Sequence, residues 1–363
     1  MIIGVDASKL VSSHKTGVEL STQELIKAVL RQDKVNTYWL YSPTPLPKKF
    51  LISDRVKNKV LPGKRLWTLY VLSQELKRTP PDIFWSPSNF FPRNLPKKAV
   101  ITIHDLAFYL FPEDYSFKSR WLSTWALKKA IRQASNIIAV SKQTKKDLKN
   151  HFAVPGENIE VIYHSLRQDL FKNQNPDEFK KLYPKLGKYF LYVGRLELKK
   201  NLLNIIQAFY KFTKNSEEPV KLFLAGSPGF GYKKIVKLIK NLNLEDKVVM
   251  PGYIDDDHLD LLYKNSLGLI FASFYEGFGL NILEGFAAGI PVITSNLGAM
   301  REIAGNAAYL VDPFNIKDIA KSFSQVADDK NLRQQLINKG TNRLKDFSWE
   351  ESADKLISLW SKI

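Results

Sequence analysis

The sequence predicts an α/β protein with two doubly wound parallel sheets, and three observations support this prediction. Short apolar runs alternate with longer amphipathic stretches along the whole chain. The runs are apolar throughout rather than at every second residue, as expected for strands that helices cover on both faces. These runs are too numerous for one such sheet, and a chain of 363 residues is long enough for two domains of roughly 150–200 residues each.

Each half of the chain is expected to contribute five strands. Those of the first half are residues 2–7, 37–41, 83–86, 100–104 and 137–140. Those of the second half are residues 190–193, 221–225, 248–250, 269–271 and 292–294. Helical patterns lie between them at residues 119–134, 201–214 and 280–288, and a last helix is expected at residues 349–360.

A boundary between the domains is expected within residues 167–188, where Pro184 and Gly187 interrupt the alternation. We therefore predict a first domain at residues 1–170 and a second at residues 171–346. The tail at residues 347–363 is expected to be a helix that returns to the first domain, because its apolar residues need a surface to cover.

The composition limits the chemistry. No residue is cysteine, which excludes disulfides, thiolate zinc sites and a cysteine nucleophile. No apolar run reaches the ~18–20 residues that span a bilayer. The first ten residues read as a buried strand, without the basic segment and cleavage site of a signal peptide. A cytoplasmic location is therefore the expectation.

The net charge of +18 favours anionic partners, such as nucleic acid, anionic lipid or phosphate-bearing substrates. A lysine-rich surface without such a partner is the alternative. Residues 48–78 hold nine basic and two acidic residues, and residues 118–149 hold nine and one. Because both windows lie in the first half, the charge is not spread evenly along the chain.

The first candidate site follows the expected strand at residues 190–193. Gly194 frees the backbone, Arg195 comes next, and Lys200 stands five residues later at the start of a helix. Two cations at one strand end suit a diphosphate, because ligands of doubly wound sheets bind beyond the carboxyl ends of the strands. Two exposed charges on a turn are the alternative.

The second candidate site follows the strand at residues 269–271. Gly277 and Gly279 permit a tight loop that opens a helix, and free amides at a helix start favour phosphate. Glu276 lies in the loop, whereas Glu284 lies inside a helix that is otherwise apolar. A carboxylate in such surroundings needs a polar partner if it is buried; a solvated face is the alternative.

The third candidate is His104, which with Asp105 ends an apolar strand abruptly. A single histidine often has a structural role. Its place at the carboxyl end of a strand favours a functional one.

Together these residues resemble glycosyltransferase family 4 of the GT-B fold, also called glycosyl transferases group 1. The similarity covers nearly the whole chain. The segment HDLAFYLFPE resembles that of bacterial mannosyltransferases and related enzymes of surface polysaccharide assembly. The most specific part of the similarity is the glutamate pair Glu276 and Glu284 within FYEGFGLNILEGFAAGIPVITS. VGRLELKKN, HDLAFYLFPE, AGSPG and FSWEE also match.

The resemblance implies two Rossmann-like domains that face each other across a cleft, with the donor in the second. The reaction implied is retaining transfer of a hexose, mannose or glucose, from a nucleoside-diphosphate sugar to a glycan acceptor, lipid-linked in the case we favour, in polysaccharide biosynthesis. The leaving phosphate assists a same-face attack, so that no protein nucleophile is required. No metal or cofactor is expected, because cationic side chains take the role of a metal.

The resemblance also assigns roles to single residues. Arg195 and Lys200 would neutralise the diphosphate, Glu276 would bind the transferred sugar, and Glu284 the ribose. His104 would position the donor sugar; His104 and Glu276 are the residues assigned to catalysis. The remaining donor contacts are assigned to the backbone of the glycine loop and of the N-terminal loop, at Gly17, Gly277, Phe278, Gly279 and Leu280.

Two segments depart from the family pattern. The first strand–helix loop offers only Gly17 where members often carry a double glycine or Gly-x-Gly. The segment that usually reads Asn-Gly-Val-Asp is His164-Ser165-Leu166-Arg167 here. Residues 255–257 are three aspartates, but they are expected to cap a helix rather than to bind a metal.

Three other functions fit parts of the sequence. A dehydrogenase should carry Gly-x-Gly-x-x-Gly after an early strand, which the first loop lacks. A non-catalytic polyanion-binding protein would explain the charge but not the glutamate pair, and nucleic acid is not an expected partner. A GT-B nucleotide-sugar epimerase is the nearest alternative, and it would release a free sugar.

Two segments of the first half indicate an anionic membrane surface as a further partner, with peripheral attachment to the inner face of the cytoplasmic membrane. Residues 64–72 combine basic, aromatic and aliphatic residues around Trp67. Trp121 and Trp125 stand four residues apart in a helix rich in lysine and arginine. Aromatic residues favour the headgroup region and cations favour anionic lipid; burial of the tryptophans in the core is the alternative.

Overall fold

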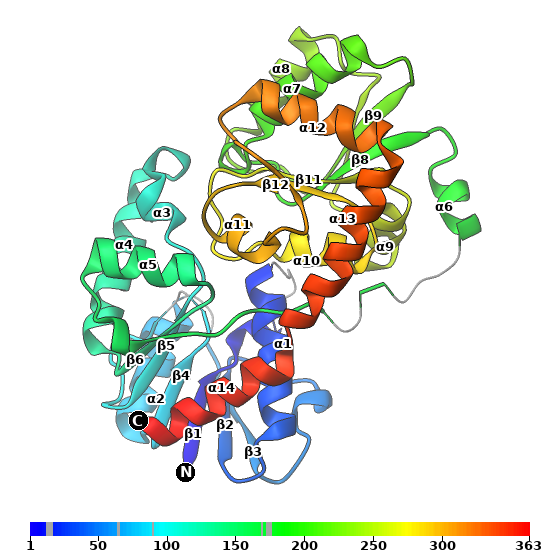
Figure 1. Cartoon of the computed structure of the whole chain (residues 1–363). Coiled ribbons are helices and arrows are strands. Elements are labelled where there is room, and N and C mark those ends of the chain that lie inside the picture. The colour runs from blue at the N-terminus through cyan, green and yellow to red at the C-terminus, as the bar shows by residue number, and fades with distance from the viewer. Residues whose placement is uncertain (12–16, 64–65, 89–90, 168–169, 172–175) are drawn as a thin grey trace. The chain divides into compact units, whose positions relative to one another are not determined.

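The computed structural model describes residues 1–11, 17–63, 66–88, 91–167, 170–171 and 176–363, and its chain divides into two compact units. Unit 1 comprises Met1–Pro112, Ser116–Arg167 and Phe347–Ile363, and unit 2 comprises Glu113–Tyr115 and Gln168–Asp346. The sequence placed the boundary at residue 170. Figure 1 labels most of the helices and strands of both units.

Unit 1 is built on a parallel sheet of seven strands in the order β3-β2-β1-β4-β5-β6-β7 within the described residues. The strands are β1 (Ile2–Asp6), β2 (Thr37–Ser42), β3 (Val56–Val60), β4 (Ile83–Ser86), β5 (Ala99–Ile103), β6 (Asn136–Ala139) and β7 (Ile159–Val161). The helices are α1 (Gly17–Gln32), α2 (Ser73–Arg78), α3 (Ala107–Leu110), α4 (Phe117–Gln133), α5 (Lys142–Phe152) and α14 (Trp349–Lys362). Shorter turns are η1 (Ser8–Val11), η2 (Lys48–Phe50), η3 (Thr68–Leu72), η4 (Pro112–Asp114) and η5 (Gly156–Asn158).

The C-terminal helix α14 lies along α1 in unit 1 (Figure 1). Leu356, Leu359 and Trp360 are buried there, so the apolar face that the sequence leaves without a partner is covered. The Trp360 ring lies 6.1 Å from the ring of Trp85 in β4. The last seventeen residues therefore belong to the core of a domain that the chain left about 180 residues earlier.

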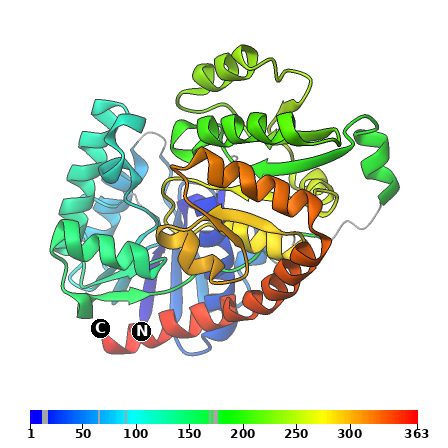
Figure 2. The same ribbon diagram turned by 45° about the horizontal axis from the view of Figure 1, so that its top comes forward.

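Unit 2 contains a parallel sheet of six strands in the order β10-β9-β8-β11-β12-β13 in the part of the chain that the structure describes. The strands are β8 (Lys188–Val193), β9 (Val220–Ala225), β10 (Val248–Gly252), β11 (Gly268–Phe271), β12 (Val292–Ser295) and β13 (Tyr309–Val311). The helices are α6 (Pro176–Leu182), α7 (Leu202–Asn215), α8 (Tyr232–Asn241), α9 (Asp256–Lys264), α10 (Leu280–Ala287), α11 (Gly298–Ala304), α12 (Ile316–Asp328) and α13 (Lys330–Arg343), with turns η6 (Leu198–Lys200) and η7 (Leu344–Asp346). Helices α7 and α12 lie side by side (Figure 2), and Phe209 of α7 and Phe190 of β8 both pack on Phe323 of α12.

All ten predicted strands and the four predicted helices are present, but three strands were missed. These are β3, β7 and β13, and each lies at an edge of its sheet. An edge strand has one neighbour and is more open to water, so its sequence need not be apolar throughout. Strand β3 reads VKNKV with an exposed or half-buried residue at four of five positions, which hides it from a search for apolar runs.

The strand order places one topological switch point in each unit. The chain moves outward from β1 to β3 and then returns to add β4 beside β1, and it does the same from β8 to β10 before adding β11 beside β8. Ligands of doubly wound sheets bind at such points, beyond the carboxyl ends of the strands. The four loops at these points are those after β1 and β4 in unit 1 and those after β8 and β11 in unit 2.

Of two smaller predictions, the helix cap at Asp255 is confirmed and the exposure of Trp67 is wrong. Asp255 caps α9, where its side chain accepts a hydrogen bond from the backbone N–H of His258, as predicted. The expectation that Trp67 faces a membrane is wrong, because Trp67 is only 6% exposed and its indole N–H donates to the Leu61 carbonyl at 2.7 Å. Its ring fills a small core with Leu72 and Phe84.

Candidate functional site

The centre of the unit 2 site is an ion pair between Lys200 and Glu276. Lys200 ends the turn that follows β8, Glu276 lies in the loop after β11, and β8 and β11 are neighbours in the sheet. The Lys200 Nζ lies 2.6 Å from Oε1 and 2.8 Å from Oε2 of Glu276. Each side chain is only 15% exposed. A cation and a carboxylate predicted separately are therefore held together at the switch point of the sheet.

Asn201 holds this pair in place and was missed by the sequence reasoning. Its φ of 62° lies in the left-handed region, which asparagine tolerates better than most residues. Its buried side-chain amide donates to the carbonyls of Ala272, at 2.9 Å, and Pro313, at 2.7 Å. The loop after β8 is thereby fastened to the loop after β11. The sequence signal that could have revealed Asn201 is an asparagine that directly follows two lysines at the start of a helix.

The glycine loop opens α10 in the way that the sequence predicts. Gly279 precedes Leu280, the first residue of α10, with a φ of 102° and no side-chain cap within the described residues. The amides of the first helical turn are donors that suit an anion. The Phe278 side chain is buried, so the donor contacts predicted for residues 277–280 are left to the backbone.

The carboxylate of Glu284 is held by two side chains whose role was not predicted from the sequence. The Tyr263 hydroxyl in α9 donates to Oε2 of Glu284 at 2.7 Å. The Asn281 amide lies 3.4 Å from the same oxygen and donates to the Val193 carbonyl at the end of β8 at 3.2 Å. The predicted need for a polar partner is met inside the protein, and the carboxylate is fixed beside the end of β8.

Among the predicted donor residues of unit 2, Arg195 is the most exposed. Its side chain is 61% exposed, and its Nε lies 2.9 Å from Oε1 of Glu197. The loop that carries both residues lies against the loop after β9, where a Cβ on Gly226 would lie 1.9 Å from the Gly194 carbonyl oxygen. The AGSPG segment thus allows two loops to pack closely and fixes where Arg195 emerges.

In unit 1, His104 follows β5 and is 6% exposed. Its Nε2 lies 2.8 Å from the Pro87 carbonyl, and its Nδ1 lies 3.3 Å from Nε2 of His164. Burial lowers the pKa of His104, and the nearby carboxylates of Asp105 and Glu19 oppose this only in part. Gly17, the other predicted residue of unit 1, is the first residue of α1; residues 12–16 before it lie outside the described residues.

A second polar group of unit 1 surrounds its switch point and was not predicted. Lys9 Nζ lies 2.8 Å from Oε1 of Glu19 in α1. Asp6, the last residue of β1, accepts the Ser8 N–H at 3.0 Å, and burial raises the pKa of its carboxyl group. Thr22 donates to the Pro87 carbonyl that His104 also contacts. Carboxylates at this position can bind sugar hydroxyls.

The predicted residues therefore form two groups, one in each unit. Arg195, Lys200, Glu276, Glu284 and residues 277–280 gather around the ends of β8 and β11, whereas His104 and Gly17 belong to unit 1. Among the described residues, no group of three or more histidine, aspartate or glutamate side chains is placed to hold a metal ion.

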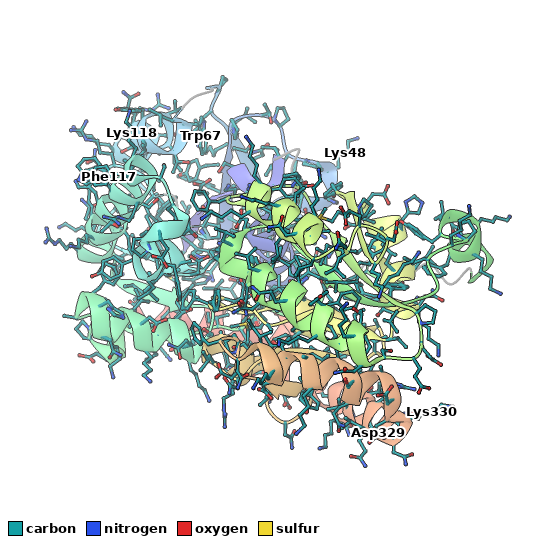
Figure 3. The ribbon with its side chains drawn as sticks, turned by 90° about the horizontal axis from the view of Figure 1, so that it is seen from above. Lys48, Trp67, Phe117, Lys118, Asp329 and Lys330 are labelled. Carbon is teal, nitrogen blue, oxygen red and sulfur yellow. The ribbon has the colours of Figure 1, made fainter. Side chains whose placement is uncertain are left out.

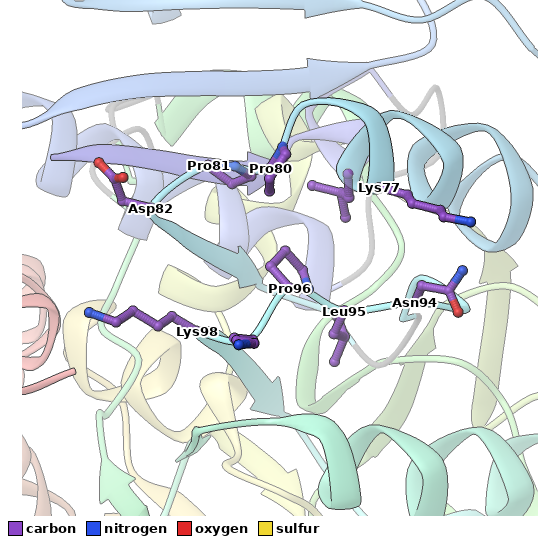
Figure 4. Close-up of a pocket in the computed structure, with 10 residues that line it drawn as sticks. Lys77, Pro80, Pro81, Asp82, Asn94, Leu95, Pro96 and Lys98 are labelled. Atoms are coloured by element: carbon purple, nitrogen blue, oxygen red, sulfur yellow. The ribbon is translucent and has the colours of Figure 1, made fainter.

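The hollow of unit 1 shown in Figure 4 is not part of either group. It has a volume of about 670 Å³ and lies where β4 and β5 begin, at the opposite end of these strands from His104. It is lined by Leu76, Lys77, Pro80, Pro81, Asp82, Asn94, Leu95, Pro96, Lys97 and Lys98.

Comparisons with known proteins agree with this geometry. The family model for glycosyltransferase family 4 matches residues 15–167, and that for glycosyl transferases group 1 matches residues 173–343. O-antigen chain mannosyltransferase B of Escherichia coli is 27% identical over 285 residues, which are 77% of this chain and 74% of that protein.

Two solved structures share the fold over nearly the whole chain. Sucrose-phosphate synthase from Thermosynechococcus elongatus superposes with a TM-score of 0.77 at 18% identity, and the match covers 99% of this chain and 98% of that protein. HepE from Anabaena, in complex with UDP-glucose, has a TM-score of 0.74 at 20% identity, and the match covers 100% of this chain and 99% of that protein. The chain therefore belongs to the glycosyltransferases of family 4, or glycosyl transferases group 1, and has their GT-B fold of two Rossmann-like domains.

Proposed function

We propose that this glycosyltransferase moves a hexose, mannose or glucose, from a nucleoside-diphosphate sugar to a lipid-linked glycan with retention of the anomeric configuration. The observation that carries the proposal is the Lys200–Glu276 pair at the switch point of unit 2, beside the uncapped start of α10. The cation and the helix start at this point suit the diphosphate of such a donor, and the carboxylate suits its hydroxyl groups.

The diphosphate would bind Lys200, Arg195 and the amides at the start of α10. Negative charge grows on the leaving phosphate as the bond to the anomeric carbon breaks, and these groups would stabilise that charge. Cationic side chains would supply the charge compensation, and we propose that no metal or cofactor is needed.

The two glutamates would bind hydroxyl groups. Glu276 would accept hydrogen bonds from the transferred sugar, and Glu284, fixed by Tyr263, from the ribose. The acceptor hydroxyl would form its bond on the face from which the diphosphate leaves and pass its proton to a phosphate oxygen. His104 would position the donor sugar, with the loop at Gly17 near the phosphates.

The comparisons support the substrate class. The Escherichia coli relative is an O-antigen chain mannosyltransferase, and HepE was solved in complex with UDP-glucose. We propose the same broad role for this chain, in cell-surface polysaccharide biosynthesis.

A thermal-shift screen with GDP, UDP, ADP and dTDP sugars tests the donor. A ligand at 100 times its dissociation constant stabilises a protein by about 2.7 kcal/mol. Stabilisation by one nucleotide class, lost in Lys200→Ala, is the expected result. No response to any of the four would contradict the donor site. Analysis of the products then separates the alternatives: a new glycoside indicates transfer, a free sugar indicates an epimerase, and no turnover indicates a polyanion-binding protein.

We further propose that unit 1 attaches to an anionic membrane through α4. Phe117, Trp121 and Trp125 are 72%, 61% and 45% exposed. Their spacing of four residues places them on one face of the helix. Figure 3 labels Phe117 and Lys118 at the beginning of this helix. An exposed aromatic face of this kind favours the interfacial region of a bilayer.

The charge of α4 complements such a surface. The helix contains five basic residues and no acidic residue. Lys129 lies 5.4 Å from the centre of the Trp125 ring and Arg120 5.8 Å from that of Phe117, so cations flank the aromatic face. Each cation near an anionic membrane contributes about 1 kcal/mol. Among the described residues, no helix has the length and apolar character needed to cross a membrane.

Co-sedimentation with phosphatidylglycerol vesicles tests the attachment. The protein is expected to bind these vesicles at low salt and to bind neutral vesicles weakly. Trp121→Ala with Trp125→Ala should weaken binding about tenfold or more, because two large apolar side chains are lost. Val35→Ala removes a residue that is 84% exposed in the same unit and should change nothing. Absence of binding at low salt would remove the membrane proposal and leave the glycosyltransferase proposal intact.

A further inference from the structure

His104 and His164 form a buried, stacked pair in unit 1. Their ring centres lie 5.3 Å apart with 24° between the ring planes. His164 follows β7 and is 5% exposed, and its Nε2 lies 3.3 Å from Nδ1 of His104. The other ring nitrogen of His104 faces the Pro87 carbonyl at 2.8 Å.

These contacts determine where the protons lie. A carbonyl oxygen only accepts, so Nε2 of His104 carries a proton and donates it to Pro87. Burial lowers the pKa of both histidines, so both rings are neutral near pH 7. Nδ1 of His104 then has a lone pair, and the Nε2–H of His164 donates to it.

We propose that His164 is a positioning residue for His104: it fixes the tautomer and the ring plane of His104 through the Nε2–H donated to Nδ1. The proposal rests on the role proposed for His104 in placing the donor sugar. Both ring nitrogens of His104 have protein partners, so the ring acts by its position and exchanges no proton with the substrate.

His164 is itself held by the segment that begins the C-terminal helix. Its ring lies 5.8 Å from that of Trp349. The Trp349 indole N–H donates to the Leu166 carbonyl at 2.8 Å, and the Ser352 hydroxyl donates to the Tyr163 carbonyl at 2.7 Å. Hydrogen bonds on both sides of His164 thus fix its backbone, which is what a positioning residue requires.

Glutamine is the conservative replacement for His164. Its side-chain amide nitrogen stands about as far along the side chain as the imidazole Nε2 and can donate a hydrogen bond as that N–H does, whereas leucine cannot. His164→Gln and His164→Leu therefore separate the donated hydrogen bond from the volume of the side chain.

Two measurements on the full chain test the proposal, namely ¹⁵N NMR of the imidazole nitrogens and the rate of transfer. In the natural protein and in His164→Gln, His104 should show one tautomer, protonated at Nε2. In His164→Leu the His104 signals should indicate a mixture of tautomers or a shifted ring. The rate constant kcat should fall about tenfold, as for the loss of one hydrogen bond. His151→Leu removes an exposed histidine of the same unit and is the matched control.

The outcomes separate this proposal from the role of His104. An unchanged His104 tautomer in His164→Leu overturns the positioning proposal, whatever the rate. A changed tautomer together with a normal rate in both His164→Leu and His104→Ala would show that His104 has no part in transfer. A pH profile of kcat that follows the titration of His104 would also overturn the proposal, since the ring would then exchange a proton.

Discussion

Lys200 and Glu276 bind each other through both carboxylate oxygens, although they stand 76 residues apart in the sequence. In the proposed function a diphosphate competes for the lysine and a sugar hydroxyl for the glutamate. The pair thus keeps both groups at the site before the donor binds and lowers the cost of their burial.

Lys200→Ala and Glu276→Ala should each reduce transfer by ~10²–10³ without unfolding the protein, because a preorganised charge contact to the transition state is lost. Steady-state rates and thermal midpoints of purified variants measure this. The double variant Lys200→Met with Glu276→Gln leaves no unpaired charge, so it should be folded and equally inactive. Near-normal turnover in both alanine variants would contradict the donor site.

Asn201→Gly should lower both stability and transfer. Glycine permits the left-handed backbone at this position, so the variant removes the side-chain amide alone. The Ala272 carbonyl then loses its donor, at a cost of about 1–3 kcal/mol, whereas Pro313 keeps a second donor in Asn204. Urea unfolding and kcat measure the two effects. A variant with unchanged stability and rate would show that the amide does not fasten the loops.

The central strands and the motif residues could be predicted from the sequence, because a short continuous stretch of residues is enough to recognise each of them. Apolar runs indicate strands covered on both faces, and the glycine loop indicates the start of α10. The partners could not be predicted, since Asn201 acts on Ala272, Tyr263 on Glu284 and His164 on His104. Each of these contacts joins segments that only the strand order brings together. Three of the four edge strands of the described sheets were missed for the related reason that exposure relaxes their composition.

Transfer should survive EDTA. In the proposed function Lys200 and Arg195 take the place that a divalent cation has in enzymes with an Asp-x-Asp motif, so the metal should be dispensable for charge compensation. Rates with EDTA and with added Mg²⁺ or Mn²⁺, measured at equal ionic strength, should agree within a factor of about two. A strict requirement for either ion would contradict the proposed role of the two cations.

Stability should fall below pH 6.5 because of the histidine pair. His104 and His164 have pKa values below their ordinary value of 6.5, so the unfolded chain takes up protons there that the folded chain does not. The stabilisation is complete above pH 6.5 and is lost as the pH falls towards the lowered values, by at most about 1.4 kcal/mol per pH unit for each histidine. In His164→Gln this slope should be smaller. An equal slope in both proteins, from unfolding measured between pH 7.5 and 5.5, would contradict the assignment.

Gly226→Ala should be much more damaging than Gly252→Ala, although both glycines have positive φ. A Cβ at Gly226 would lie 1.9 Å from the Gly194 carbonyl oxygen, whereas nothing lies within 4 Å of one at Gly252. Gly252→Ala should therefore cost only the backbone strain of about 1–2 kcal/mol. Gly226→Ala adds an overpacking cost of about 1–3 kcal/mol and displaces the loop that carries Arg195, so donor binding should weaken in this variant alone. Urea unfolding and titration with the nucleoside diphosphate measure the two effects, and equal losses in both variants would show that the close packing of the loops after β8 and β9 does not place Arg195.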